Sequence, residues 1–468
     1  MKRYLLVALI AFVLFGCNNN PHHRTNDGKA NDTTELTVEE QTQILEISDD
    51  ETNAHGPCAP VDPHFDRPNA TLDNKPLINI FIENSGSMNG FINDQSDFQN
   101  AVQKMIVLLK NYYSKENIHL FYINSQIHAQ TIPAGKDPAD FAEEMLKKNR
   151  FNSVGNTRST DLNELVKLVL GDTNDKDISI LISDCIYSIS GKGTSKTLLG
   201  NCQNKTMDVF MEKSKTMDNL ATLIVRLESH FKGGYWDYLH PSGNASQTLD
   251  CERPYYMCVI GSDSAISEFN KYIDVEKMQG YSEKYFLSNK DVSYAYHMFV
   301  QGQYSKGKMR KVKEEFCALE DVDDNNKHDV RLAVAVDLSA FPFTEKEKLN
   351  LDNYSIGNGS YELTSVEVID DKKLSPNDKP VVKNNGCTHI LLIDKIGAVS
   401  DFSVKVKRTM PEWVSKFSSS DDTGIGNDEE EQEKTFGIEY FVSGIFEAYC
   451  ENAKDKGNFI EMKFKVKK

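Results

Sequence analysis

The stretch Leu77-Ile78-Asn79-Ile80-Phe81-Ile82, followed by Glu83-Asn84-Ser85-Gly86-Ser87-Met88-Asn89-Gly90, decides how the folded part of the chain is interpreted. Its first half is short and mostly apolar, which is typical of a strand buried on both faces of a parallel sheet. A helical pattern of apolar residues follows from Phe98 to Leu109. A buried strand followed by a helix is the repeating unit of α/β proteins, in which ligands bind at the carboxyl ends of the strands.

The same alternation continues to about residue 280. Further strands are expected at Ile118–Ile123, Ile178–Ile182, Leu220–Leu227 and Tyr255–Ile260, and helices at Phe141–Leu146 and Leu162–Leu170. Strands that alternate with helices at this spacing predict a doubly wound α/β domain at 74–280. Its sheet is expected to be mostly parallel, with helices on both faces.

From residue 281 the pattern changes to short alternating runs with few helices between them. These runs lie at Val292–Val300, Val330–Leu338, Tyr361–Ile369, His389–Ile393 and Phe402–Val406. They favour a β-rich, sandwich-like antiparallel domain at 281–468. One helix is expected in this domain, from Gly437 to Cys450.

Hydroxyl and carboxylate side chains gather at two of the expected strand ends. Ser85 and Ser87 follow the first strand, and Asp184 comes just after the strand at Ile178–Ile182. Thr160 lies where the helix at Leu162–Leu170 begins. Glycines in the first loop are expected to let the backbone turn sharply and aim both serine hydroxyls at one point. Hard cations such as Mg²⁺ prefer oxygen ligands of this kind.

The order and spacing of these residues resemble the von Willebrand factor A domain with its metal-ion-dependent adhesion site. That family has an Asp-x-Ser-x-Ser loop after the first strand, a threonine from a second loop and an aspartate after the fourth strand. Ser85 and Ser87 match the two serines, Thr160 matches the threonine and Asp184 matches the second aspartate. The resemblance implies a Mg²⁺, Mn²⁺ or Ca²⁺ ion with one open position, which a carboxylate of a protein ligand fills. It therefore implies binding rather than catalysis.

Glu83 departs from the family pattern, because it stands where the family has its first aspartate and is one methylene longer. Mg²⁺ demands near-ideal geometry. Two interpretations stay open. Either Glu83 coordinates the cation directly and weakens its pull on a partner's acid, or the site is metal-free. In the second case the α/β domain is a structural or assembly scaffold, and the C-terminal domain carries recognition.

The N-terminus has the pattern of a bacterial export signal. Lys2 and Arg3 precede an apolar run from Leu5 to Phe15, which is too short to cross a bilayer. Leu14-Phe15-Gly16-Cys17 resembles a lipobox, in which the family diacylates the cysteine and cleaves just before it. Residues 1–16 are thus the expected signal peptide. Cys17 is the expected lipid anchor to a membrane, and 17–73 a flexible tether.

The expected location is the bacterial cell envelope. By resemblance to the enterobacterial sorting rule, an aspartate after the lipidated cysteine would indicate the inner membrane. Asn18 stands there instead, which favours the outer membrane.

Composition and motifs exclude other classes of function. The chain has 468 residues with 53 Lys and Arg against 70 Asp and Glu, a net charge of −17 that argues against a nucleic-acid partner. No Gly-x-Ser-x-Gly or His-Glu-x-x-His motif is present, and Ser305-Lys306-Gly307-Lys308 lacks the partner motifs of penicillin-binding chemistry. We therefore expect no enzyme, and an envelope hydrolase is the least favoured alternative.

Two further features lie outside the matched residues. The acidic segment Asp421–Glu433 lacks the ligand spacing of a calcium loop, which favours a solvated loop. Eight cysteines remain beside Cys17, and their pairing cannot be deduced from the sequence. One hypothesis is that Cys185 bonds to Cys202 or Cys251 and stiffens the loop of Asp184, while buried free thiols are an equal alternative.

Overall fold

The structure is a computed structural model, and it describes residues 75–93, 96–157, 160–241, 243–289, 294–313, 315, 317–323, 330–339, 341 and 343–467. All of these residues fall within one compact unit of the chain. None of their helices is long and apolar enough to cross a membrane. The predicted signal peptide, Cys17 and the tether up to residue 73 lie outside the described residues.

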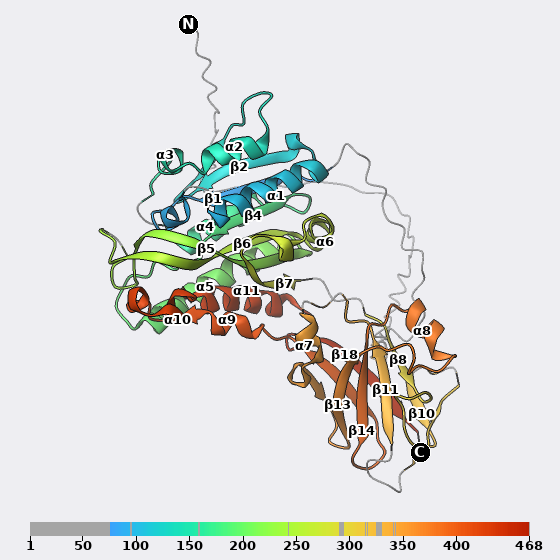
Figure 1. The fold of residues 1–468 in the computed structure, drawn as a ribbon. Coiled ribbons are helices and arrows are strands. Elements are labelled where there is room, and N and C mark those ends of the chain that lie inside the picture. The colour runs from blue at the N-terminus through green and yellow to red at the C-terminus, as the bar shows by residue number, and fades with distance from the viewer. Residues whose placement is uncertain are drawn as a thin grey trace, which may run out of the picture. The chain divides into compact units, whose positions relative to one another are not determined.

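A seven-stranded sheet forms the centre of the α/β part (Figure 1), in the order β3-β2-β1-β4-β6-β5-β7 within the described residues. Its strands are β1 (Ile78–Glu83), β2 (Ile118–Ile123), β3 (Ile127–Gln130), β4 (Ile178–Ser183), β5 (Leu220–Tyr235), β6 (Gln247–Ser262) and β7 (Tyr281–Ser288). β1 pairs in parallel with β2 and β4, and all six of its residues are buried, as its apolar sequence predicts. β3, β6 and β7 run antiparallel to their neighbours. The sheet is therefore mixed, and β1, β2, β4 and β5 share one direction.

The antiparallel half of this sheet comes from one long hairpin. β5 and β6 have 16 residues each and pair from Leu220 opposite Ser262 to Tyr235 opposite Gln247. The chain between them spans only residues 236–246. Because a parallel pair needs a crossover, usually a helix that covers the sheet, this short connection returns the strand antiparallel. Both strands extend well past the predicted Leu220–Leu227 and Tyr255–Ile260.

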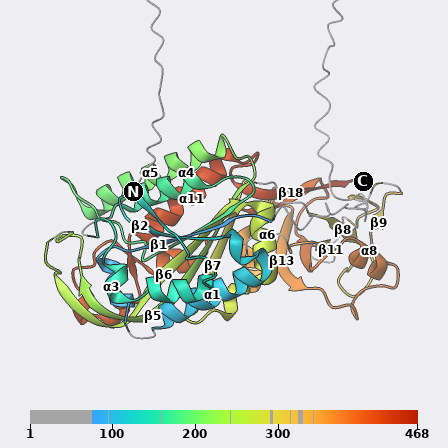
Figure 2. The same cartoon turned by 90° about the horizontal axis from the view of Figure 1, so that it is seen from above.

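Helices cover both faces of the sheet, as predicted (Figure 2). On one face lie α1 (Asp97–Tyr113), α2 (Pro138–Met145) and α6 (Asp263–Tyr272), and on the other α4 (Leu162–Asp172) and α5 (Ser195–Ser214). The short α3 covers Lys148–Phe151. Alternating residues of each strand face the two cores, so that Ile80 and Ile82 lie in one and Phe81 in the other.

Two segments beyond residue 280 also pack with this sheet. β7 pairs with β5, and α9 (Glu412–Lys416), α10 (Glu429–Gln432) and α11 (Ile438–Asn452) follow later in the chain. α11 lies beside α5 (Figure 1), where its Gly444 allows a close approach, since a Cβ there would lie 2.6 Å from the carbonyl oxygen of Gln203. The sheet and the helices that pack on it therefore extend beyond residue 280, the predicted domain boundary.

A buried arginine holds the returning segment against the sheet. Arg226 of β5 is fully buried, and its guanidinium donates to the carbonyl oxygen of Glu433 at 2.7 Å. The same group lies over the ring of Phe417 at 3.9 Å and donates to Ser282 Oγ at 2.8 Å. These hydrogen bonds and an ion pair with Glu228 compensate the buried charge of Arg226.

Two further sheets occupy the rest of the predicted second domain. Their orders are β12-β15-β18-β10-β9 and β13-β14-β11-β8 among the described residues. Of the described strands in these two sheets, only β10 and β18 pair in parallel. Buried residues of both sheets, such as Val334 and Val404, share one core. The bounds of these strands are β8 (Tyr296–Phe299), β9 (Arg310–Lys311), β10 (Ala318–Glu320), β11 (Arg331–Val336), β12 (Tyr354–Ile356), β13 (Tyr361–Val368), β14 (His389–Lys395), β15 (Phe402–Lys407) and β18 (Asn458–Val466).

The remaining elements are short. They are the helices α7 (Glu345–Leu349) and α8 (Asp378–Asn384), the paired strands β16 (Ser418–Ser419) and β17 (Thr435–Phe436), and 3₁₀ turns at Ser87–Phe91, Lys115–Asn117, Val275–Lys277, Leu351–Asn353 and Ile425–Asn427. The predicted helix at Gly437–Cys450 is α11, and the predicted runs of the second domain match β11, β13, β14 and β15 within a residue or two at their ends. β8 begins at Tyr296, four residues after the start of its predicted run at Val292.

Candidate functional site

The candidate site forms where β1 and β4 end side by side. The two strands pair in parallel with Ile82 opposite Ile182, so the residues after them leave the sheet at one edge. Glu83 ends β1 and Asp184 follows β4, and each is only 4% exposed. Ser183 Oγ donates to Glu83 Oε2 at 2.5 Å, which joins the two strand ends directly.

The side chains of Ser85 and Ser87 point toward each other, and their Oγ atoms form a hydrogen bond of 3.0 Å. The reason given for the glycine between them is wrong. Gly86 has φ −61° and ψ −36°, which any residue can adopt. Space explains it better, because a Cβ on Gly86 would lie 3.3 Å from the carbonyl oxygen of Thr157 and 3.5 Å from the ring of Trp236.

Backbone carbonyls of the segment 151–157 hold the second loop against the first. Asn84 Nδ2 donates to two of these carbonyl oxygens at 3.0 and 2.8 Å, and Gly86 N donates to a third at 2.8 Å. Asn84 is fully buried, so these bonds replace its contacts with water. They bring Thr160, which follows this segment, to the edge where β1 and β4 end. Arg158 and Ser159 of the same loop lie outside the described residues.

Thr160 brings a hydroxyl of the second loop to the site. The residue is 8% exposed, and its Oγ1 is buried without a hydrogen bond of normal geometry to any described residue. It still lies near enough to the Glu83 carboxyl to lower the pKa of that group. An unpaired buried hydroxyl costs about 1–3 kcal/mol. The neighbouring Asp161 is the N-cap of α4, because its carboxylate accepts a hydrogen bond from Asn163 N at 2.9 Å.

The two carboxyl groups of the site are both hard to ionise. Burial, followed by the charge of nearby Asp184, raises the pKa of Glu83 to about 8. Burial also raises the pKa of Asp184, although the Ser87 hydroxyl and the Arg253 guanidinium act in the opposite direction. Burial disfavours the charged form of each carboxyl group, and the charge of Asp184 further disfavours ionisation of Glu83.

A small cavity of about 50 Å³ opens at these residues. Since 10–15 Å³ is enough for one water, about 50 Å³ admits an ion with a few waters or one small polar group. The residues that line it are Glu83, Ser85, Gly86, Ser87, Thr160, Ile186, Tyr187, Ser188, Tyr235, Trp236, Asp237, Tyr238 and Pro241. Four of the five predicted site residues line it, and the fifth, Asp184, contacts Ser87.

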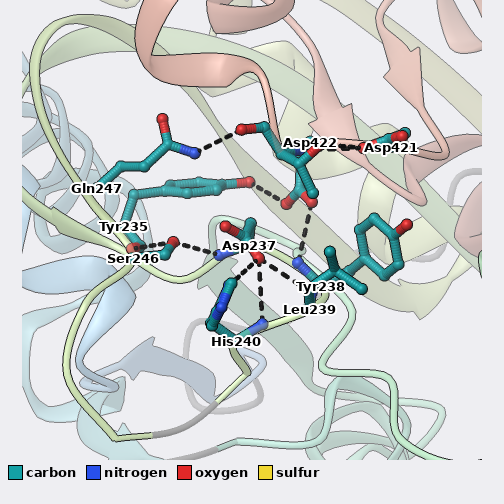
Figure 3. Close-up of polar contacts among 10 residues, drawn as sticks. Tyr235, Asp237, Tyr238, Leu239, His240, Ser246, Gln247, Asp421 and Asp422 are labelled. Carbon is teal, nitrogen blue, oxygen red and sulfur yellow. Dashed lines mark hydrogen bonds and ion pairs between the residues drawn. The ribbon is translucent and has the colours of Figure 1, made fainter.

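One wall of the cavity belongs to the hairpin tip, which we define as residues 235–246. A loop at residues 421–427 holds this tip (Figure 3): Tyr235 OH donates to Asp422 Oδ2 at 2.7 Å, and Tyr238 N donates to Asp422 Oδ1 at 3.0 Å. Gln247 Nε2 donates to the Thr423 carbonyl oxygen at 2.9 Å. The tip is therefore fixed from outside the hairpin.

Sequence reasoning missed this wall. It ended the strand at Leu227 and left Trp236 and Tyr238 without a role. Two signals were present: the aromatic residues Phe231 and Tyr235, which fall on the same side of an extended strand, and the turn formers Pro241-Ser242-Gly243-Asn244. Together they indicate a longer hairpin.

The acidic segment Asp421–Glu433 is not a solvated loop throughout, because Asp422 and Ile425 are buried. Its carboxylates do not converge either. Among the residues that the structure describes, no group of three or more His, Cys, Asp or Glu side chains is placed to hold a metal. The candidate site has two carboxyl groups and three hydroxyls, so hydroxyls would have to supply much of any coordination.

The hypothesised disulfide from Cys185 is wrong. Cys185, Cys202 and Cys251 are all free thiols. The Cys185 side chain lies in the core between the sheet and the helices α4 and α5, beside the side chain of Cys258. Burial there raises the pKa of the Cys185 thiol. Cys317, by contrast, is disulfide-bonded.

No protein-family model, curated protein or solved structure matches this chain. The resemblance to the von Willebrand factor A domain therefore stays a prediction. It rests on Glu83, Ser85, Ser87, Thr160 and Asp184, of which the first four line the cavity.

Proposed function

We propose that this chain binds a carboxylate-bearing ligand through a divalent cation, Mg²⁺ or else Mn²⁺ or Ca²⁺, held by Ser85, Ser87, Thr160 and Asp184 beside Glu83. One observation carries the proposal. Ser85, Ser87 and Thr160, from two separate loops, meet around a single cavity. The buried Thr160 hydroxyl makes no hydrogen bond of normal geometry to any described residue. A ligand atom in the cavity would satisfy it.

The donor set suits a hard cation. Mg²⁺ takes six oxygens at about 2.0–2.1 Å and usually keeps several waters, so a few hydroxyl and carboxylate oxygens are sufficient. The Ser85 and Ser87 oxygens are already 3.0 Å apart, close enough to serve one ion. Hydroxyl ligands add no negative charge, so the bound ion keeps its attraction for a carboxylate of the ligand.

The charge of the site also supports a cation. Burial, followed by the charge of Asp184, raises the pKa of Glu83 to about 8, so ionisation of this carboxyl group is disfavoured without a nearby cation. A divalent ion would supply positive charge and lower the pKa values of both acids. Glu83 accepts a hydrogen bond from Ser183, so its carboxyl group is positioned before any ion arrives.

The wider proposal concerns location and fold. The chain would be a lipoprotein anchored at Cys17 to a membrane of the bacterial envelope, the outer membrane being favoured, with a protein ligand as its partner. The parallel strands β2-β1-β4 with the site at their carboxyl ends support a von Willebrand A-like fold. The core shared by the two C-terminal sheets supports a β-sandwich.

Thermal unfolding of the purified full-length protein tests the cation site. Unfolding is recorded with EDTA and then with Mg²⁺, Mn²⁺ or Ca²⁺. A ligand at 100 times its Kd that binds only the native state stabilises by about 2.7 kcal/mol, so the midpoint is expected to rise. Ser85→Ala/Ser87→Ala is expected to abolish the rise.

Ser190→Ala/Ser415→Ala is the matched control, because both serines are exposed and neither lines the cavity. It is expected to respond as the wild type does. A wild type that responds to none of the three cations contradicts the proposal and favours the metal-free scaffold.

A further inference from the structure

Trp236 is held in a fixed position at the edge of the cavity. Its Nε1–H donates to the carbonyl oxygen of Gly243 at 3.1 Å. A Cβ on Gly86 would lie 3.5 Å from the six-membered ring, and a Cβ on Gly234 would lie 3.4 Å from it. Two glycines, one in the first site loop and one on β5, therefore leave room for the indole to lie against the backbone.

The neighbouring Tyr238 is fixed as well. Its ring stacks on that of Phe436, with centroids 5.5 Å apart and 4° between the ring planes. Trp236 and Tyr238 both line the cavity, yet both stay partly exposed. Rigid aromatic rings at the edge of a site offer a large apolar contact that costs little conformational entropy when a ligand binds.

The cavity has room for a carboxylate but not for the group that carries it. Its volume of about 50 Å³ is that of a few waters. A carboxylate inside would leave its carrier at the opening, beside the two aromatic rings. None of the described residues that line the cavity is Lys or Arg, so the carrier would meet apolar surface rather than positive charge.

We propose that the ligand is a carboxylate joined to a flat apolar group, such as an aromatic ring, which stacks on Trp236. This inference rests on the proposed cation site. The cation binds the carboxylate, and Trp236 determines which carriers of a carboxylate are accepted. Trp236 is therefore a specificity-determining residue, not a ligand of the ion.

The test compares phenylacetate with acetate as probes. Purified full-length protein saturated with Mg²⁺ is titrated with each acid in a calorimeter. Aromatic stacking adds about 0.5–1.5 kcal/mol, which corresponds to an affinity for phenylacetate about two- to tenfold higher than for acetate. Trp236→Ala is expected to abolish this preference, and Trp236→Phe, which keeps an aromatic face, is expected to retain part of it.

Binding of Mn²⁺ alone is measured in parallel for every variant. Loss of the phenylacetate preference in Trp236→Ala, with Mn²⁺ affinity unchanged, supports the inference. Equal affinity for the two acids in the wild type, or a preference that survives in Trp236→Ala, overturns the inference and leaves the cation site standing. A wild type that does not bind Mn²⁺ overturns both. If Trp236→Ala does not fold, Trp236→Leu, which is apolar but not flat, takes its place in the same comparison.

Discussion

Thr160 carries a buried hydroxyl that makes no hydrogen bond of normal geometry to any described residue. We therefore predict that stability and cation binding respond in opposite directions to one substitution there. Thr160→Val replaces the hydroxyl with a methyl group of nearly the same shape at a position that is 8% exposed. Removal of an unsatisfied buried polar group regains its desolvation cost of about 1–3 kcal/mol. We expect Thr160→Val to stabilise the EDTA-treated protein by about 1 kcal/mol, the lower end of this range. The gain is small because the Thr160 hydroxyl also favours the ionised form of Glu83, and the variant loses that interaction.

The same substitution removes a proposed ligand of the cation. Wild-type protein with Mn²⁺ at 100 times its Kd should gain about 2.7 kcal/mol, and Thr160→Val should lose most of that gain. The two proteins therefore change order: the variant is the more stable one in EDTA, and the wild type is the more stable one with Mn²⁺. Urea unfolding under both conditions measures the two differences.

Thr173→Val is the matched control for this prediction. Thr173 is 3% exposed, but its hydroxyl is hydrogen-bonded to the Val169 carbonyl oxygen at 2.8 Å and to Ser179 Oγ at 2.9 Å. Its loss should destabilise by about 1 kcal/mol and leave the response to Mn²⁺ intact. The reasoning is refuted if Thr160→Val destabilises the EDTA-treated protein as the control does, or if Mn²⁺ still stabilises it fully.

Three further predictions concern the fold. Arg226→Ala should destabilise by about 3 kcal/mol in urea unfolding, because the buried guanidinium bonds the segment that returns to the sheet; a loss below 1 kcal/mol would contradict that role. Gly90→Ala should lower the free energy of unfolding by about 1–3 kcal/mol, because its Cβ would lie 2.2 Å from the Phe231 ring. In a double-mutant cycle, adding Phe231→Leu should recover part of this lost stability. Burial, together with the charge of Lys311, lowers the pKa of His297 to about 4, against about 6.5 when unfolded. The folded protein therefore prefers the neutral imidazole, so this stability is complete above pH 6.5 and is lost as the pH falls toward 4. His297→Gln should make the urea midpoint depend less on pH between 6.5 and 4. An unchanged pH dependence would argue against a lowered pKa of His297.

The centre of the fold and most of the site were predictable because β1 and β4 are buried on both faces. Such strands are nearly continuous apolar runs, which stand out in a sequence. Parallel pairing then places Glu83 and Asp184 at one edge of the sheet. Thr160 could be placed there because it precedes a helix that packs on the same sheet.

The outer part of the β5–β6 hairpin was not predictable to the same degree. Beyond Leu227 exposed residues alternate with buried ones, and among the described strands β5 continues to pair with β6 but not with β7. The apolar content of the sequence therefore marks this part of the strand less clearly. Contact between Trp236 and the cavity depends on the length of this hairpin. The position of α11 was hidden for a related reason, because an amphipathic pattern predicts a helix without indicating which core it covers.

Anomalous scattering from a crystal grown with Mn²⁺ tests the central claim most directly, namely that one cation is held in the cavity. The account predicts a manganese peak bounded by the hydroxyls of Ser85, Ser87 and Thr160 and the carboxylate of Asp184. The peak should be absent from a crystal of Ser85→Ala/Ser87→Ala grown under the same conditions. A wild-type crystal with no peak in the cavity, or with manganese only at other positions, would contradict the account.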